Sequence, residues 1–404
     1  MTTPSTPARL QRAVRQGLRL LTRPVRMAKG RGGIAVQAYR GYGSARQVFL
    51  IGRVFRQPEF GARLPEGTLG RILNDLGRRL LRRGVGEAIL IARLYGGEQY
   101  VRTDKDGYFR INMNLLAKPY ADLAWHGMEL ELIRPVRVRT QGIVFIPSEP
   151  SRFVVISDID DTIMHTGVAS KAKMLWHLFA KDASSRTAFP GMAALLRALY
   201  RGPDGADMNP MLYVSRAPWS IYEVLDEFFN MHRIPVGPLL FLREWGLTLQ
   251  RPLPRQAKGH KMAVIRSMME VYHDLPVVLI GDSGQRDAEV YTQIVREQPG
   301  RVLAIYIRNV SEGLRRPQAI GHLARDVERA GSTMVLAEDS EAIARHAVEH
   351  GLIPEAAMPA VRGEIADAES GLHPTVTAPA GQATQDAEAA NVVVESEPER
   401  RRHG

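Results

Sequence analysis

Two aspartates separated by one residue follow an apolar run near the middle of the chain. The run is Val154–Ser157, and the two carboxylates are Asp158 and Asp160. If the run is a strand of an open α/β sheet, both carboxylates lie outside its carboxyl end, where such sheets bind ligands. Carboxylates there can attack a substrate, transfer protons or bind a metal ion. The same residue types also cap helices and form turns, so both interpretations stay open for the pair alone.

Three later segments add polar side chains in a fixed order. A second apolar run ends at Ser215, Lys261 begins a helical run, and a third apolar run ends at Asp282, with Asp287 further on. Taken singly, Lys261 could be a surface helix lysine and Ser215 a strand cap. Their order along the chain resembles that of the haloacid dehalogenase superfamily of phosphotransferases.

That resemblance implies a role for each of the first two aspartates. A phosphoryl group carries spread negative charge, so its transfer depends mainly on positioning and electrostatic stabilisation. In the implied mechanism Asp158 attacks phosphorus and forms an aspartyl-phosphate, while Asp160 protonates the leaving oxygen and then activates water. The second carboxylate favours a phosphatase over a dehalogenase, because a phosphoester leaving group needs an acid.

The resemblance also implies a cation beside the nucleophile. Phosphate would repel a carboxylate without one, and oxygen-ligated Mg²⁺ supplies the positive charge. Ser215 and Lys261 are then expected to hold the phosphoryl oxygens and to offset developing charge. The implied magnesium ligands are Asp158, Asp160 through its backbone carbonyl, Asp282 and Asp287.

Longer stretches surround these residues. They are Ser157–Ile163, Phe189–Met192, Tyr213–Tyr222, His260–Lys261, Ile280–Asp287 and Ala304–Arg308. Together they resemble the catalytic domain of the actin-patch-type phosphatidate phosphatases, over about residues 150–310 and more weakly before them. This resemblance implies Mg²⁺-dependent hydrolysis of phosphatidate to diacylglycerol and phosphate, although distant relatives within such families differ in substrate.

Four residues near these motifs are candidates for a rim that meets a bulky substrate. Arg216 and Arg308 are the predicted substrate-binding residues, and Trp219 and Tyr222 could join them. The alternative for Trp219 and Tyr222, which are three residues apart, is that they pack in the core.

Apolar runs alternate with helical patterns over residues 149–338, which predicts an α/β domain with a haloacid-dehalogenase-like parallel sheet flanked by helices. The gaps of 57 residues from 158 to 215 and of 46 from 215 to 261 leave no room for a large cap, so the site should be open. A C-terminal helix at 339–353 and a disordered acidic tail at 354–404, which has no aromatic residue, are expected to follow. The predicted strands are Phe153–Ser157, Met211–Ser215, Leu239–Leu242, Val277–Ile280 and Val302–Ile307.

Short β-like runs separated by turn signals fill residues 45–148 and predict a small β-sandwich domain, with one helical insert at Gly67–Arg83. Residues 1–44 are predicted to be a basic, flexible arm, in which Ala8–Arg26 has the pattern of a short amphipathic helix. Attraction of this arm to an anionic surface and a bland solvated or disordered segment both stay open. The predicted strands are Val48–Val54, Ala88–Arg93, Gln99–Arg102, Tyr108–Met113, Met128–Leu132 and Gly142–Ile146.

The net charge of +11 is spread unevenly along the chain, and the charge asymmetry lies at its ends. Residues 1–50 hold nine Arg, one Lys and no acid, which gives +10, and residues 355–404 hold nine acids against four Arg, which gives −5. The absence of cysteine excludes disulfides, zinc–thiolate sites and a cysteine nucleophile. No apolar stretch approaches about 18 residues and no signal-peptide pattern is visible. We expect a cytoplasmic protein, with peripheral attachment to anionic membranes through the arm as a further possibility.

Two alternatives to a phosphatidate phosphatase stay open. One is a phosphatase of the same mechanism that acts on a nucleic-acid end, a phosphoprotein or a soluble metabolite; nucleic acid is the less favoured partner, because no recognised nucleic-acid-binding motif is present. The other is a non-catalytic adaptor at a membrane surface. The complete set of acidic residues, Ser215 and Lys261 argues against the adaptor, because a scaffold does not need them together. Protein partners are not indicated.

Overall fold

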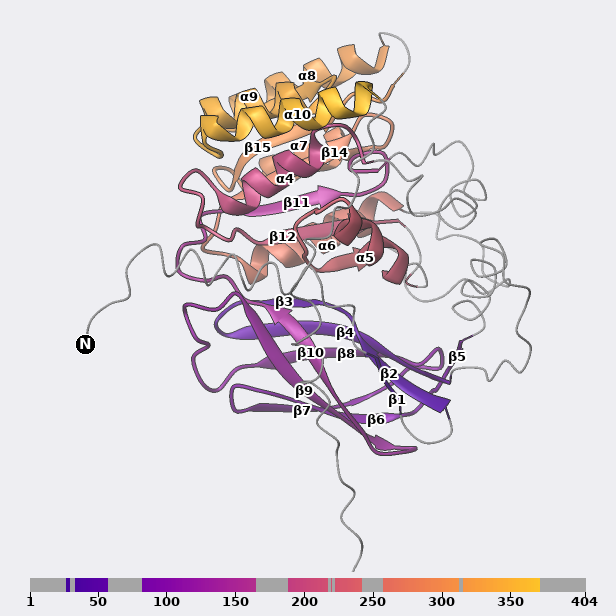
Figure 1. Ribbon diagram of the computed structural model, residues 1–404. Coiled ribbons are helices and arrows are strands. Elements are labelled where there is room, and N and C mark those ends of the chain that lie inside the picture. The colour runs from indigo at the N-terminus through magenta and orange to yellow at the C-terminus, as the bar shows by residue number, and fades with distance from the viewer. Residues whose placement is uncertain are drawn as a thin grey trace, which may run out of the picture.

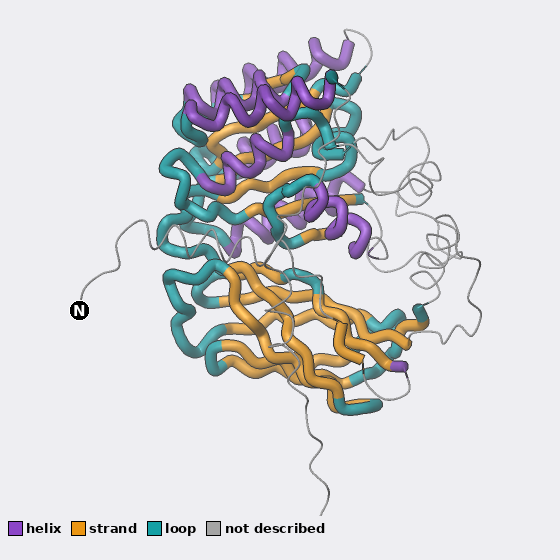
Figure 2. The backbone as a smooth tube through the Cα atoms, viewed as in Figure 1, coloured by secondary structure: helices purple, strands orange, loops and turns teal. Residues whose placement is uncertain are grey.

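The computed structural model describes residues 27–29, 33–56, 82–164, 188–216, 219, 222–241, 257–311 and 315–370. Within these residues the chain forms two bodies that pack against each other (Figure 1). One contains a six-stranded parallel sheet and the α-helices, and the other contains a ten-stranded, mainly antiparallel sheet. Figure 2 shows the helices gathered around the parallel sheet and strands dominating the other body. No described helix is long and apolar enough to cross a lipid bilayer.

The parallel sheet has the strand order β13-β12-β11-β14-β15-β16. All residues of β11, β12 and β14 are buried, as expected for strands covered on both faces. The chain order reverses between β11 and β14, and such a switch point opens a crevice at the carboxyl ends of the strands. β16 was not predicted, because it is a four-residue edge strand with mixed burial. The strands are β11 (Val154–Asp158), β12 (Met211–Ser215), β13 (Leu239–Phe241), β14 (Val277–Asp282), β15 (Val302–Arg308) and β16 (Met334–Ala337).

Helices cover both faces of this sheet, because successive strand residues point to opposite sides. Val155 packs in one apolar cluster with helices α4, α5, α9 and α10, and Val154 and Ile156 pack in another with α6, α7 and α8. The prediction of a parallel sheet flanked by helices is therefore confirmed. The helices are α4 (Met192–Arg201), α5 (Tyr222–Met231), α6 (Ala257–Val271), α7 (Asp287–Glu297), α8 (Arg315–Arg329), α9 (Ser340–Glu349) and α10 (Met358–Glu369), with a 3₁₀ turn, η4, at Glu355–Ala357.

The antiparallel body does not confirm the predicted two-sheet sandwich. Strand β3 pairs with β4 on one side and with β10 on the other, so the strands join into one hydrogen-bonded sheet. Alternate residues such as Val48, Leu50 and Leu130 point into one apolar core. The strands are β1 (Met27–Lys29), β2 (Ile34–Ala38), β3 (Gly41–Gly43), β4 (Gln47–Arg56), β5 (Arg83–Gly84), β6 (Ile89–Leu94), β7 (Gly97–Arg102), β8 (Tyr108–Asn114), β9 (Trp125–Arg134) and β10 (Val138–Phe145).

Two predicted boundaries are wrong. The arm predicted for residues 1–44 includes β1, β2 and β3, because the apolar run Ile34–Ala38 forms a fully buried strand within a basic region. The tail predicted for residues 354–404 begins with η4 and α10. Three predicted features lie outside the described residues: the helix at 8–26, the insert at 67–83 up to residue 81, and the tail at 371–404. Residues 82–83 of the insert are described and do not form a helix.

Helix α10 is part of the core although its sequence lacks aromatic residues. Met358 and Val361 are buried in the cluster that contains α4. Glu364 accepts a hydrogen bond at 3.0 Å from the backbone N–H of Ala194, in the first turn of α4, where the N-cap residue Gly191 has no side chain to do so. α10 therefore completes α4 as well as covering it.

Replacing Val361 with alanine tests the placement of α10. Val361 is fully buried, so we expect Val361→Ala to lower the free energy of unfolding by about 1.5–3 kcal/mol. Glu369→Ala, on the exposed end of the same helix, is the control and should change it by less than about 0.5 kcal/mol. Equal, negligible effects in urea unfolding would show that these residues form a tail after all.

Candidate active site

Three adjacent strands end in polar residues at the same edge of the parallel sheet. Asp158 is the last residue of β11, Ser215 of β12 and Asp282 of β14. Lys261 reaches the same place from α6. All four side chains are buried, with at most 1% of each residue exposed. The fold thus brings together the residues that the sequence pattern selected, at the switch point between β11 and β14.

A tight turn after β11 places Asp160 beside the neighbouring strand. Asp161 has a φ of 57°, and the carbonyl of Ile159 accepts hydrogen bonds from the backbone N–H groups of Thr162 and Ile163. As a result one carboxylate oxygen of Asp160 accepts hydrogen bonds from the Ser215 hydroxyl at 3.2 Å and from the backbone N–H of Arg216 at 3.1 Å. Asp158 and Asp160 are two residues apart, but their side chains have different surroundings.

Lys261 forms two buried ion pairs. Its Nζ lies 2.6 Å from an oxygen of Asp158 and 2.6 Å from an oxygen of Asp287. Burial opposes the charge of the ammonium group, but the two carboxylates outweigh it and hold the pKa of Lys261 well above its usual value. Lys261 is therefore a fixed positive charge next to Asp158.

Burial raises the pKa of three carboxyl groups in this site, those of Asp158, Asp160 and Asp282. The pKa of Asp282 rises to about 7, first because the group is buried and then because Asp287 is close. Burial also raises the pKa of Asp160, and the hydrogen bonds from Arg216 and Ser215 offset only part of that rise. Asp160 thus holds a proton more readily than an exposed aspartate does, as a general acid requires.

Asp158, Asp282 and Asp287 could hold a metal ion. Each offers a carboxylate oxygen, and these oxygens lie within 4.8 Å of one another. When all three carboxylates are ionised, they and the ammonium group of Lys261 carry a charge of −2, since −3 + 1 = −2, and a divalent cation would neutralise this buried charge. One oxygen of Asp282, Oδ2, is buried without a hydrogen-bond partner in the described part of the chain. An unpaired oxygen in an all-oxygen group fits a hard cation such as Mg²⁺.

Asp160 takes part in this group through its backbone rather than its side chain. Its carbonyl oxygen accepts a hydrogen bond from Nε2 of Gln285 at 3.0 Å, and the same nitrogen donates to Oδ2 of Asp158 at 3.2 Å. Both oxygens therefore face a common point. The carboxylate of Asp160 faces Ser215 instead, which leaves it available for proton transfer.

Gln285 and Arg316 were not singled out from the sequence. Gln285 lies in the loop between Asp282 and Asp287, and this position is the signal that could have identified it. Its amide contacts two of the predicted magnesium ligands, Oδ2 of Asp158 and the carbonyl oxygen of Asp160. Arg316 holds this loop: it donates at 2.7 Å to the carbonyls of Ser283 and Gln285, and it pairs with Glu289. Nothing in the sequence distinguishes Arg316 from the other arginines of its helix.

The predicted rim residues divide into two groups. Arg216 is partly exposed beside Asp160 and fits the prediction. Placing Arg308 on the rim is wrong: it is 4% exposed, stacks over Phe189 at 4.1 Å and donates to Ser340, because its strand ends under α9. Trp219 and Tyr222 are buried, as the alternative interpretation proposed.

Lys261→Met tests the electrostatic design of the site. It leaves Asp158 and Asp287 buried without their counter-charge, so we expect the free energy of unfolding to fall by about 3–5 kcal/mol at neutral pH. Burial raises the pKa of Asp158, so the folded variant binds more protons than the unfolded chain. Its stability therefore rises as pH falls, and the loss should shrink at about pH 5.

Urea unfolding of the variant at several pH values measures this loss. Lys105→Met, in an exposed turn, is the control and should behave like the parent at every pH. A Lys261→Met protein as stable as the parent would contradict the ion-pair analysis.

Comparison with known proteins places the catalytic segment. Residues 153–309 match the family model described as "Phosphatidate phosphatase APP1, catalytic domain". The phosphatidate phosphatase APP1 of Saccharomyces cerevisiae is 29% identical over 208 residues, which cover 50% of this chain and 34% of the yeast protein. An uncharacterized protein of Schizosaccharomyces pombe is 28% identical over 160 residues, 39% of this chain and 25% of that protein.

Solved structures add little. A carbohydrate acetylesterase from Xanthomonas citri aligns over 72% of each chain with 9% identity and a TM-score of 0.23, which is too low to indicate a common fold. The chain spans 34% and 25% of the two yeast relatives, so the match concerns the catalytic segment and not their whole length. Residues 153–309, which contain every residue of the site except Arg316, are thus similar to the catalytic domain of the phosphatidate phosphatase APP1 family.

Proposed function

We propose that this chain is a Mg²⁺-dependent phosphatidate phosphatase with a haloacid-dehalogenase-like catalytic domain, which releases diacylglycerol and phosphate at a membrane surface. One observation carries the proposal: two buried carboxylates, two residues apart, have opposite surroundings. Asp158 lies against the ammonium group of Lys261, and Asp160 lies against a hydroxyl and a backbone N–H. Such a pair suits a nucleophile and an acid–base catalyst. The similarity of residues 153–309 to the catalytic domain of phosphatidate phosphatase APP1 supports phosphatidate as the substrate.

In the first proposed step an oxygen of Asp158 forms a bond to phosphorus. The bond between phosphorus and the glycerol oxygen breaks, its electron pair stays on that oxygen, and Asp160 gives it a proton. Diacylglycerol leaves, and the phosphoryl group remains on Asp158. Lys261, 2.6 Å from Asp158, is placed to offset the negative charge that gathers around phosphorus.

In the second step a water oxygen attacks the phosphorus of the aspartyl-phosphate. Asp160, now a carboxylate, takes the proton of that water, and the bond between phosphorus and Asp158 breaks. Inorganic phosphate leaves, Asp158 is again a carboxylate, and Asp160 is again protonated. The hydrogen bonds from Ser215 and Arg216 keep the Asp160 carboxylate in one orientation for both transfers.

The cluster of Asp158, Asp282 and Asp287 supports a bound cation as part of the proposal. Asp158, Asp282, Asp287 and the carbonyl of Asp160 would hold it. Bound there, Mg²⁺ supplies the positive charge that lets a carboxylate approach a phosphate.

Phosphate release from phosphatidate in mixed micelles tests the proposed activity. We expect release that requires Mg²⁺ and stops with EDTA. Asp158→Asn should lose at least about 10⁴-fold in kcat, because it removes the nucleophile, and Asp160→Asn should lose about 10²–10⁴-fold.

A panel of soluble phosphate esters and phosphorylated nucleic-acid ends completes this test. Release mainly from those substrates would keep the mechanism and discard the lipid substrate. Release from nothing, by a protein that still binds vesicles, would favour the adaptor.

Cation binding can be measured without any substrate. A ligand that binds only the folded state stabilises it by about 2.7 kcal/mol at 100 times its Kd, so MgCl₂ should raise the melting temperature of the protein. Asp282→Asn should remove most of that rise, because it takes away a carboxylate of the group. NaCl at the same ionic strength is the control. An equal rise in the parent and the variant would contradict the assignment of the cation to this site.

A further inference from the structure

The last residue of β12 and the residue after it both donate hydrogen bonds to the proposed acid, Asp160. Ser215 and Arg216 provide the two donors that the Asp160 carboxylate has among the described residues. Trp219 lies three residues further on, and α5 begins at Tyr222. The start of α5 is therefore close in sequence to Arg216, one of the two donors.

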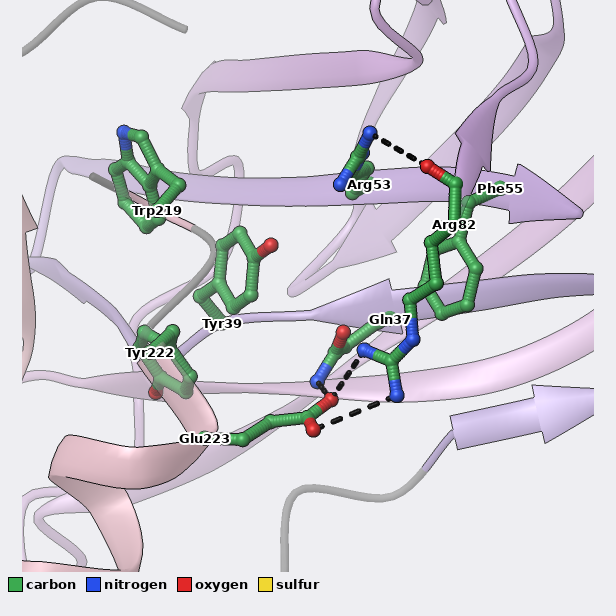
Figure 3. A pocket seen from close by; sticks show the side chains of 8 residues that line it. All are labelled: Gln37, Tyr39, Arg53, Phe55, Arg82, Trp219, Tyr222 and Glu223. Carbon is green, nitrogen blue, oxygen red and sulfur yellow. Dashed lines mark hydrogen bonds and ion pairs between the residues drawn. The ribbon is translucent and has the colours of Figure 1, made fainter. Parts of the chain in front are cut away.

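The far end of this segment packs on the antiparallel sheet. Tyr39, between β2 and β3, stacks on Trp219 with ring centroids 4.7 Å apart and contacts Tyr222 at 4.4 Å. All three rings are buried, with at most 5% of each residue exposed. Figure 3 shows Tyr39 between these two rings and the arginines that come from the antiparallel sheet.

Polar contacts fix α5 at the same interface. The backbone N–H of Arg40 donates to the Tyr222 hydroxyl at 3.1 Å, and its guanidinium group forms a buried ion pair with Asp226. One turn earlier, Arg82 pairs with Glu223 at 2.6 Å, and Gln37 donates to the same carboxylate at 2.8 Å (Figure 3). Buried charges tolerate little displacement, because separating them leaves each one desolvated and unpaired.

We propose that Tyr39 is a positioning residue for the general acid Asp160, acting through Trp219 and Tyr222. This inference rests on the proposed function. Ser215 is held in β12, so the donor that this contact can act on is the backbone N–H of Arg216, three residues before Trp219. Displacements of about 1 Å in a catalytic group can cost about 10²-fold in rate. Tyr39 acts from a distance, because the described hydrogen bonds to the side chains of Asp158 and Asp160 come from residues of the other body, namely Ser215, Arg216, Lys261 and Gln285.

The leaving group separates positioning of the acid from general damage. Glycerol oxygen needs a proton to leave, whereas nitrophenolate leaves without one. We expect Tyr39→Leu to lower kcat/KM by about 10-fold for monomeric dioctanoyl phosphatidate and by less than about 2-fold for p-nitrophenyl phosphate. This quantity reports events up to departure of the leaving group, and a smaller folded fraction would lower both values equally.

Three variants serve as controls. Tyr39→Phe keeps the ring stack and should restore the parental ratio of the two values. Phe109→Leu removes a buried ring from the core of the antiparallel sheet, away from the segment, and should leave the ratio unchanged. Glu223→Gln, which weakens the pairing with Arg82 at a half-buried position, should lower the ratio in the same direction even if Tyr39→Leu does not fold.

Two results would overturn the inference, and they are distinguishable. If the parent hydrolyses both substrates and neither Tyr39→Leu nor Glu223→Gln changes the ratio, the antiparallel sheet does not position Asp160, and the proposed function stands. If the parent hydrolyses neither substrate with Mg²⁺ present, the proposed function is wrong and this inference falls with it.

Discussion

The buried ammonium group of Lys261 is the interaction on which the site depends. Asp158 and Asp287 are both inaccessible to solvent, and Lys261 forms an ion pair with each of them. The sheet places Asp158 at the end of β11, α7 starts with Asp287, and α6 brings Lys261 between them. Three separate parts of the chain are therefore tied together by one charge. The same charge lies where a phosphoryl group would need it, so the requirement of the fold and that of the chemistry coincide.

Much of this arrangement could be predicted from the sequence, because it depends on apolar runs that form strands and end in polar residues. Five of the six parallel strands are short apolar runs, and the residue that ends three of them is polar. Carboxyl ends of neighbouring parallel strands meet at one edge, so Asp158, Ser215 and Asp282 were expected together. Lys261 followed from its place in the order of the motifs rather than from any geometry.

Other features could not be predicted, because they depend on contacts between distant residues. Arg316 holds the loop after β14 from a helix that begins about 30 residues later, and its sequence context is simply basic. Arg308 ends its strand as the active-site residues do, yet β15 lies one strand further from the switch point and α9 covers its end. The strands of residues 27–43 lie within the predicted basic arm, because the short apolar run Ile34–Ala38 is a weaker signal in the sequence than the arginines around it.

The hydrogen bond that the start of α4 donates to α10 has a consequence for folding during synthesis. The N-cap residue of α4, Gly191, has no side chain that could accept a hydrogen bond. Glu364 accepts one there instead, from the backbone N–H of Ala194, which lies 170 residues earlier in the chain. A ribosome that has synthesised β11, α4 and β12 has therefore produced a sheet edge whose first helix is still incomplete. That helix is completed only after nearly all of the catalytic body has emerged, so a nascent chain interrupted before α10 would expose the apolar face of α4 to chaperones and proteases.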